Sequence, residues 1–132
     1  MTQTPEDLRY TEEHEWVLRI SPTRVRVGIT DYAQTQLGDV VFVQLPKIDD
    51  EAEQGQSIAE VESTKSVSDI FAPLKAKIVA VNDLLVAEPE QLNADPYGDG
   101  WLFELEVSDA AALDNSLGEL LDATGYQAVI GG

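Results

Sequence analysis

Alternating apolar residues mark two neighbouring strands near the start of the chain. Apolar side chains occupy every second position from Trp16 to Ile20 and again from Val25 to Ile29. This alternation is typical of a strand with one buried face. The intervening residues 21–23, Ser-Pro-Thr, are turn formers, so we expect a hairpin.

The next segment carries the signals of a helix followed by a strand. Thr30 or Asp31 can cap a short helix near residues 31–37, and Gly38 offers the left-handed residue that ends it. A continuous apolar run follows at 40–43. Because β-branched and aromatic residues in an unbroken run favour a strand that is buried on both faces, we expect this run in the core.

Short strands are also predicted in the middle of the chain. Their expected ranges are 56–62, 67–72, 78–81 and 101–107. The first two are joined by the polar residues 63–66, which places Lys65 at a hairpin tip. The segment 93–100 is rich in turn formers and predicts an ordered loop.

The last part of the chain is predicted to be helical. Ser108 is the expected cap of an alanine-rich helix, and Ser116 with Glu119 has the spacing of a capping box. The residues that would share one helical face are Leu113, Leu117, Leu120 and Leu121. Repeated short strands, with helices near the start and the end, favour a mostly-β sandwich or barrel.

Length and composition limit the function classes. The 132 residues are enough for one domain with a buried core, so we expect a single domain over 1–132 with a loose tail at 1–9. Eight Lys and Arg against 25 Asp and Glu give a net charge of −17, which disfavours nucleic acid as a partner. The absence of cysteine excludes disulfides, thiolate metal sites and a cysteine nucleophile.

Hydropathy and the N-terminal residues indicate where in the cell the protein is expected. No apolar run reaches the roughly 20 residues of a membrane span, so we expect no membrane partner. The segment 1–8 lacks the pattern of a signal or transit peptide, which favours a cytoplasmic protein.

Lys65 has unusual sequence neighbours. It is the only basic residue in the segment 48–74, which contains seven acids. A nucleophilic lysine needs an ammonium group that is destabilised by burial or by a nearby cation. An exposed tip flanked by carboxylates has the opposite effect, so the residues favour a lysine that is presented to solvent or to a partner over a catalytic one.

The remaining candidate residues favour structural roles. His14 is the sole histidine, and the glutamates of segment 12–15 point to alternate sides of an extended chain, so we expect no metal site. Trp16 and Trp101 lie in strand patterns and are expected to anchor the core. No nucleophile–base pair can be assembled from these residues, so we do not expect an enzyme.

Several segments occur together in the order of one known family. They are 10–16 (YTEEHEW), 28–34 (GITDYAQ), 37–46 (LGDVVFVQLP), 60–73 (EVESTKSVSDIFAP), 81–82, Asn93, 95–102 (DPYGDGWL) and 121–126. From about residue 9 onward the chain resembles the glycine cleavage system H proteins. The resemblance implies a barrel-sandwich hybrid of the lipoyl and biotinyl domain type, with a short helix at 31–37 and a helical C-terminus.

The resemblance also implies a function. Lys65 is expected to carry lipoate in amide linkage, attached by a separate lipoate-attaching enzyme. In the family the arm takes the aminomethyl group from a pyridoxal-phosphate-dependent glycine decarboxylase to a tetrahydrofolate-dependent aminomethyltransferase, and dihydrolipoyl dehydrogenase then removes electrons from it. We therefore expect a non-catalytic, monomeric carrier.

Three further residues match, or lie beside, positions that line a cleft in the family. Glu15 and Asp69 are expected there, and His14 adjoins Glu15. A carboxylate in a partly dry groove would hold the protonated amine of the loaded arm. The alternative is that both acids are ordinary surface charges.

One turn departs from the family pattern. Lys75 and Ala76 stand where lipoyl domains usually have Ser-Gly, shortly after the proline equivalent to Pro73. Ala76 would be strained if this turn keeps a positive φ. The added lysines are also expected to affect the efficiency of lipoylation.

Other carrier roles stay open at this level. A lipoyl carrier for sulfur-compound oxidation, or for lipoate relay to 2-oxo acid dehydrogenases, would have the same lysine motif. A biotin carrier is disfavoured because biotinyl domains have Met-Lys-Met where this chain has Thr64-Lys65-Ser66. An unmodified structural homologue would retain its function after Lys65→Arg.

Overall fold

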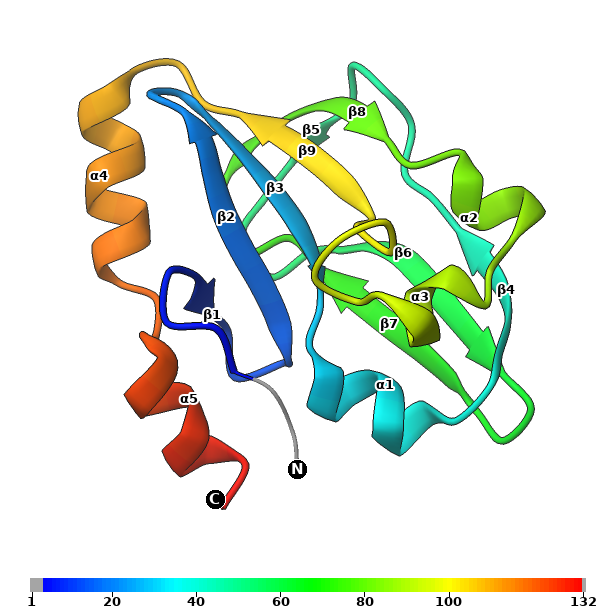
Figure 1. Ribbon diagram of the computed structural model, residues 1–132. Coiled ribbons are helices and arrows are strands. Elements are labelled where there is room, and N and C mark those ends of the chain that lie inside the picture. The colour runs from blue at the N-terminus through cyan, green and yellow to red at the C-terminus, as the bar shows by residue number, and fades with distance from the viewer. Residues whose placement is uncertain (1–3, 132) are drawn as a thin grey trace.

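Two antiparallel sheets and several short helices make up the computed structural model, which describes residues 4–131 (Figure 1). The strands are β1 (Arg9–Tyr10), β2 (Glu15–Ser21), β3 (Arg24–Ile29), β4 (Val40–Gln44), β5 (Glu51–Ala52), β6 (Ser57–Ser63), β7 (Val67–Phe71), β8 (Ala76–Val81) and β9 (Phe103–Glu106). The helices are α1 (Asp31–Leu37), α2 (Leu84–Ala87), α3 (Gln91–Ala94), α4 (Ala110–Gly118) and α5 (Ala123–Val129). This confirms a mostly-β fold with a short helix at 31–37 and a helical C-terminus.

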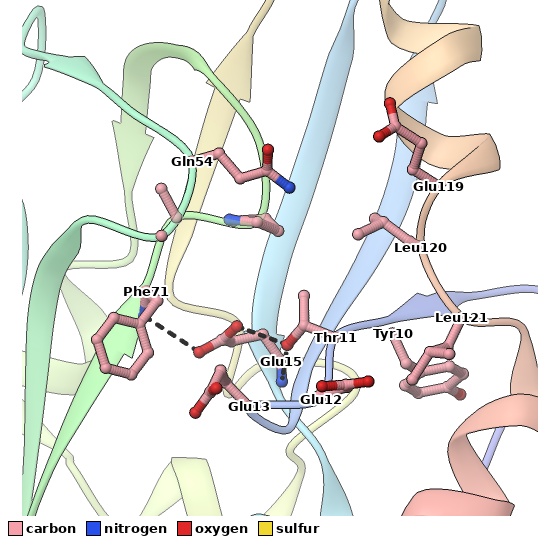
Figure 2. Close-up of a pocket in the computed structure, with 13 residues that line it drawn as sticks. Tyr10, Thr11, Glu12, Glu13, Glu15, Gln54, Phe71, Glu119, Leu120 and Leu121 are labelled. Atoms are coloured by element: carbon pink, nitrogen blue, oxygen red, sulfur yellow. Dashed lines mark hydrogen bonds between the residues drawn. The ribbon is translucent and has the colours of Figure 1, made fainter.

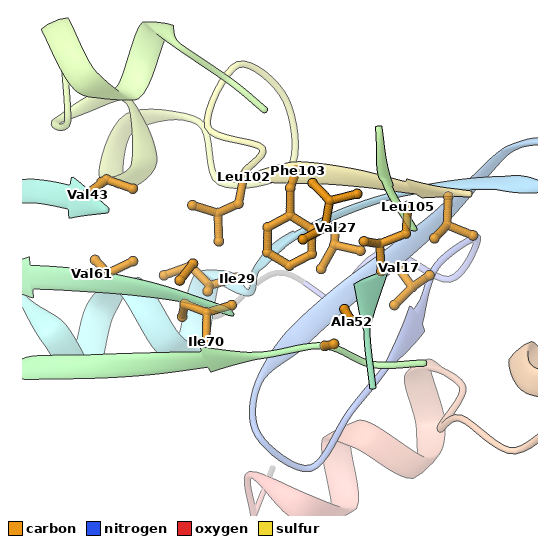
Figure 3. Close-up of a cluster of buried hydrophobic side chains, with 14 of the residues drawn as sticks. Val17, Val27, Ile29, Val43, Ala52, Val61, Ile70, Leu102, Phe103 and Leu105 are labelled. Carbon is orange, nitrogen blue, oxygen red and sulfur yellow. The ribbon is translucent and has the colours of Figure 1, made fainter. Parts of the chain in front are cut away.

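The strands divide unequally between the sheets. The large sheet has the order β1-β2-β3-β9-β8-β5, and the small sheet has the order β4-β6-β7. The main core lies between them (Figure 3). Its fully buried members include Val25, Val27, Val61, Phe103 and Leu105. The two sheets thus share one core, as a barrel-sandwich requires.

A second, smaller core lies on the other side of β2. It is built from Leu8, Tyr10, Trp16, Ala123 and Tyr126. Because Trp16 lies in this cluster while Val17 faces the main core, the start of β2 is buried on both faces. The predicted hairpin of β2 and β3 is confirmed, but its alternation did not reveal that Val17 is buried.

The tryptophans differ in burial. Trp16 is fully buried, and its indole N–H donates to the Pro96 carbonyl oxygen at 2.8 Å, which confirms it as an anchor. Trp101 is only half-buried, and the guanidinium of Arg26 lies 4.6 Å from the centre of its ring. Trp101 therefore supports a cation–π contact at the surface as well as packing against the second core.

Helix α1 begins and ends close to the predicted positions. The Thr30 hydroxyl oxygen accepts a hydrogen bond from Ala33 N at 3.2 Å, which confirms the cap. Gly38 follows the helix with φ 82° and ψ −158°. Its φ is positive as predicted, but its ψ is extended, so it is not the left-handed helical residue that we expected. The chain leaves α1 directly into β4.

The prediction that β4 is buried on both faces is wrong. Val40 and Val43 are buried, whereas Val41 and Phe42 are 53% and 52% exposed. Two features explain the difference. The register of β4 against β6 shifts between Val40 and Phe42, which is a β-bulge, and β4 lies at the edge of the small sheet.

The predicted strands in the middle of the chain are confirmed with small changes of boundary. The last of them is shorter than expected, since β9 covers only 103–106. Leu102 and Glu104 are also buried, so this segment does not have one polar face. Helix α3 overlaps the start of the predicted loop at 93–100. Helices α2 and α3, of four residues each, are too short to leave a periodic pattern.

The C-terminal helices begin at different residues from those predicted. Asp109, not Ser108, caps α4, and its carboxylate accepts from Ala112 N at 2.7 Å. Ser116 lies inside α4, so the predicted capping box with Glu119 is wrong. Helix α5 is capped by Asp122 instead.

The leucines do not share one helical face as expected. Leu120 and Leu121 lie between α4 and α5, where the backbone N–H and C=O of Leu121 both bond to Tyr10. This bridge holds the chain extended between the helices, so a single C-terminal helix cannot form.

The structure also changes two expectations, one about the N-terminal tail and one about the turn at Ala76. Of the expected loose tail, residues 1–3 lie outside the described residues, while Leu8 is buried and Arg9 begins β1. Ala76 begins β8, where it pairs with Ala52. Among the described residues, the non-glycine positions with positive φ are His14 and Asp49. Ala76 is therefore not strained.

No helix in the described part of the chain is long and apolar enough to cross a membrane.

Candidate functional site

Lys65 lies at the tip of the hairpin formed by β6 and β7. The turn is organised by Ser63, whose hydroxyl oxygen accepts hydrogen bonds from Lys65 N and Ser66 N, each at 3.1 Å. Ser63 N also donates to the Ser66 carbonyl oxygen at 2.8 Å. The Lys65 side chain is exposed. A hydrogen-bonded turn therefore presents a solvent-accessible amine.

The hairpin tip is attached to the connection between α1 and β4, which lies beside it (Figure 1). Thr64 N donates to the Asp39 carbonyl oxygen at 3.1 Å. The aliphatic part of Lys65 passes Gly38, since a Cβ at Gly38 would lie 3.1 Å from Lys65 Cε. The missing side chain at Gly38 thus leaves room for the lysine.

Asn93 of α3 fixes this connection from the other side. Its amide nitrogen donates to the Gly38 carbonyl oxygen at 2.9 Å and to Gln34 Oε1 at 3.0 Å, and its oxygen accepts from Val40 N at 2.9 Å. One side chain therefore ties α1, α3 and β4 together next to the lysine.

A groove of about 320 Å³ leads away from the hairpin between α1 and β7. At one end it is lined by Ser66 and Val67, and at the other by Glu13 and His14, with Tyr32 of α1 along its wall. We call it the arm groove. Its lining is mixed, with apolar side chains beside hydroxyl groups.

A second hollow of about 370 Å³ adjoins the arm groove and contains Glu15 (Figure 2). Glu13 lines both spaces, so the two lie next to each other at this residue. We call the second hollow the Glu15 pocket. It lies between the start of β2, the end of β7 and the segment that precedes α5.

Glu15 is 1% exposed and is held by two hydrogen bonds. Its Oε1 accepts from the Thr11 hydroxyl at 2.6 Å, and its Oε2 accepts from Phe71 N at 3.1 Å. Burial raises the pKa of Glu15 to about 7, despite these two bonds, which favour the ionised form. The carboxyl group in the pocket therefore changes its protonation state near neutral pH.

His14 is positioned by the second core. Its φ is 74°, and its Nδ1 lies 2.8 Å from the Tyr126 hydroxyl, which in turn lies 2.7 Å from Thr30 Oγ1. Burial lowers the pKa of His14, which favours the neutral form of the ring. The ring contributes a polar wall to the arm groove.

Asp69 lies on a different face from Glu15. It is exposed, it accepts a hydrogen bond from the Ser57 hydroxyl at 3.2 Å, and it pairs across the strands with exposed Glu60. Because directly opposed residues point to the same side of a sheet, Asp69 faces outward with Glu60. The structure thus brings His14 and Glu15 together but places Asp69 apart from them.

Two residues of the site were missed by the sequence reasoning. Thr11 orients the Glu15 carboxyl group, and Tyr126 orients His14. Thr11 lies four residues before Glu15, but in an irregular segment where spacing carries no signal. Tyr126 is 112 residues away from His14.

The arrangement is chemically suited to a cation. A buried carboxyl group at the end of a partly apolar groove favours a positively charged group attached to an apolar chain. Within residues 4–131, no cluster of three or more His, Asp or Glu side chains could hold a metal ion.

Comparison with known proteins gives a consistent result. The family model described as "Glycine cleavage H-protein" matches residues 8–130. A glycine cleavage system H protein from Nocardia farcinica is 79% identical over 132 residues, which is all of both chains. One from Mycobacteroides abscessus is 61% identical over 96% of each chain.

A solved structure has the same fold. The crystal structure of a glycine cleavage system H protein from Mycobacterium marinum matches with a TM-score of 0.84 and 42% identity, and it covers 97% of this chain and 99% of that one. The chain therefore belongs to the glycine cleavage H-protein family.

Proposed function

We propose that this chain is the lipoyl-bearing shuttle of glycine cleavage, with lipoate in amide linkage on Lys65. The main support is the position of Lys65, an exposed amine on a turn fixed by Ser63 in a member of a lipoate-carrying family. The two sheets share one core, which fits a single carrier domain.

The residues around Lys65 fit an attached acyl arm. An enzyme that attaches lipoate needs access to the amine, and the exposed tip provides it. Amide formation removes the positive charge of Lys65. When bound, lipoate supplies the dithiolane sulfurs that take up an aminomethyl group and later release electrons. The rigid tip supplies a fixed mount, so tethering raises the local concentration of the arm at each partner.

Three catalytic partners follow from this proposal. They are a pyridoxal-phosphate-dependent glycine decarboxylase, a tetrahydrofolate-dependent aminomethyltransferase and dihydrolipoyl dehydrogenase. The carrier works as a monomer that visits each in turn and has no catalytic residues of its own. Its exposed hairpin suits three different active sites because it protrudes from the sheet (Figure 1).

The arm groove and the Glu15 pocket give the loaded arm a protected position. Ser66, the neighbour of Lys65, lines the arm groove, and Glu15 lines the adjoining pocket. The Glu15 carboxylate holds the protonated amine, and this cation in turn favours the ionised form of Glu15. Neutral His14 does not repel the amine. Thr11 and Phe71 keep the carboxyl group oriented.

Mass spectrometry tests the attachment directly. The chain is produced in cells that are supplied with lipoate and a lipoate-attaching enzyme, and its intact mass and peptides are measured. We expect one lipoyl group on the peptide that contains Lys65. Lys65→Arg removes it, whereas Lys75→Arg, at another exposed lysine, retains it. An unmodified wild-type chain would contradict the proposal.

Reconstitution tests the pathway. The lipoylated chain is combined with glycine decarboxylase and labelled glycine, and transfer of label to the chain is measured. We expect loading that depends on Lys65. Loading only by a 2-oxo acid dehydrogenase or a sulfur-oxidising system would assign the chain to one of those pathways instead.

Loss of the aminomethyl group from the loaded chain tests the role of Glu15. We expect Glu15→Ala to speed this loss by about tenfold, because a charge-assisted hydrogen bond of roughly 1.5 kcal/mol is removed. Asp69→Asn serves as the matched control and leaves the rate unchanged, since Asp69 faces outward. Equal rates for wild type and Glu15→Ala would exclude Glu15 from this role.

A further inference from the structure

Two exposed apolar residues flank an acid on the outer face of the small sheet. Glu62 of β6 pairs with Phe42 of β4 on one side and with Val67 of β7 on the other. Phe42 is 52% and Val67 57% exposed. Because directly opposed residues point to the same side, the three side chains form one row. This row crosses the sheet close to the Lys65 tip.

The β-bulge in β4 enlarges this apolar surface. It adds Val41, which is 53% exposed, next to Phe42. A regular strand would turn one of two consecutive residues into the core. The bulge gives up that hydrophobic stabilisation and exposes both side chains. Bulges of this kind often re-aim side chains next to functional sites.

Carboxylates surround the apolar residues. Glu60 and Asp69 form the next row of the same face, beyond Glu62. The three strands of the small sheet contain no Lys or Arg. Among the described residues, Glu60 and Glu62 take part in no salt bridge. Their charges are therefore available to a partner.

We propose that this outer face is the docking surface for the glycine-decarboxylating enzyme, which would offer an apolar recess bordered by Lys or Arg side chains. The docking residues are Val41, Phe42, Glu60, Glu62, Val67 and Asp69. The proposal rests on the lipoyl-carrier function above. Its basis is continuity, since Glu62 lies three residues from Lys65, together with the complementarity of an acidic, apolar face to a basic, apolar one.

The order of the reactions separates this enzyme from the aminomethyltransferase, which meets the arm with its amine attached. The glycine-decarboxylating enzyme meets the arm before any amine is attached, so the Glu15 pocket has no cation to hold. The arm is then free to extend from the tip beside the outer face. Contacts on that face, and not the Glu15 pocket, must position the carrier at this step.

Kinetics with the lipoylated chain test the proposal. KM and kcat of the glycine decarboxylase for the carrier are measured for Phe42→Ala and Val41→Ser. The matched control is Ile48→Ala, which removes an apolar side chain that is 51% exposed and lies beyond the far end of β4. We expect KM to rise by about tenfold for Phe42→Ala, with little change in kcat. For the control, KM should change by less than about twofold.

Charge is tested in the same assay. Glu60→Gln is expected to weaken the rise of KM between 20 and 200 mM salt, whereas Glu51→Gln, an exposed acid of the large sheet, leaves it unchanged. Over this range of salt concentration the Debye length falls from about 20 Å to about 7 Å, so the attraction between charges on the two proteins is increasingly screened. Thermal unfolding of each variant shows whether it is folded.

The outcomes separate the two proposals. An unchanged KM for Phe42→Ala and Val41→Ser, an equal rise for Ile48→Ala, or an effect confined to the aminomethyltransferase or to dihydrolipoyl dehydrogenase would overturn the docking surface while leaving the carrier function intact. A wild-type chain without lipoate on Lys65 would overturn the carrier function, and the docking proposal with it.

Discussion

Glu15 is a fully buried acid with two hydrogen bonds and no salt bridge to any described residue. Its pKa rises from 4.5 to about 7 because burial penalises the charged form. The folded chain therefore binds more protons than the unfolded chain between these two values. Glu15 contributes stability at low pH, and this contribution is lost as the pH rises through about 7.

Glu15→Gln isolates this effect. The amide keeps a similar shape but does not titrate, so the unfolding free energy of the variant relative to wild type should increase by about 2 kcal/mol from pH 5 to pH 8. Urea denaturation across this range measures the difference. Glu12→Gln, at an exposed acid, serves as the control and should run parallel to wild type. Parallel curves for Glu15→Gln would show that Glu15 is ionised throughout.

Position 28 must be glycine because the Trp16 ring fills the space that a side chain would need. The two residues are paired across β2 and β3, and a Cβ at Gly28 would lie 2.6 Å from Trp16 Cζ2. We expect Gly28→Ala to lower the unfolding free energy by roughly 3 kcal/mol, because the indole must move and lose its bond to Pro96. Gly118→Ala, where nothing lies within 4 Å, should be neutral or stabilising. Chemical denaturation of both variants checks this.

The sequence predicts single residues of the site unevenly. Lys65 is placed at a hairpin tip by the polar residues between two strands, and that placement is confirmed. The contact between Glu15 and Phe71 joins residues that are 56 positions apart and belong to different sheets, so no local pattern encodes it. Asp69 matches a family position that lines the cleft, but this match does not predict which side of the sheet its side chain faces.

At the scale of elements, β4 shows what a hydrophobic pattern can and cannot predict. The run Val40–Val43 correctly predicts a strand, because β-branched residues fit a pleated sheet. It does not predict the bulge, which depends on how β4 pairs with β6. A continuous apolar run therefore fits both a strand buried on two faces and an edge strand in which a bulge exposes part of the run.

Asn93 links α1, α3 and β4 next to the lysine hairpin. Asn93→Ala removes its bonds to Gln34, Gly38 and Val40 and leaves a partly buried backbone N–H without its partner. We expect a loss of roughly 2 kcal/mol in unfolding free energy and faster amide exchange at residues 38–41.

Hydrogen exchange and denaturation of this variant are compared with Asn115→Ala, at an exposed position in α4. The control should change neither quantity. Unchanged exchange at 38–41 in Asn93→Ala would mean that the backbone of this connection is held by other contacts.

At the scale of the whole molecule, the net charge of −17 acts in two opposite directions. Like charges repel within the folded chain, so screening them with salt should stabilise it. The same screening should weaken association with a basic partner. A carrier that visits several enzymes benefits from attraction that is long in range and easily reversed.

We expect the melting temperature to rise by about 4 °C between 20 and 500 mM NaCl, which corresponds to roughly 1 kcal/mol for a domain of this size. Calorimetry at pH 7.5 measures this change, and choline chloride at equal ionic strength separates screening from specific ion effects. A melting temperature that falls with both salts would show that attractive ion pairs, such as Arg26 with Glu104, outweigh the repulsion.

The hydrogen bond from Phe71 N–H to Glu15 gives the molecule an internal reporter. Phe71 ends β7, the strand that leaves the lysine tip, so its amide proton lies in the pocket wall but belongs to the hairpin. The chemical shift of this proton in an NMR spectrum should follow the ionisation of Glu15, with a midpoint near pH 7. It should move again when a cationic amine enters the pocket. One backbone resonance can thus report where the proposed lipoyl arm rests, without a label on the arm itself.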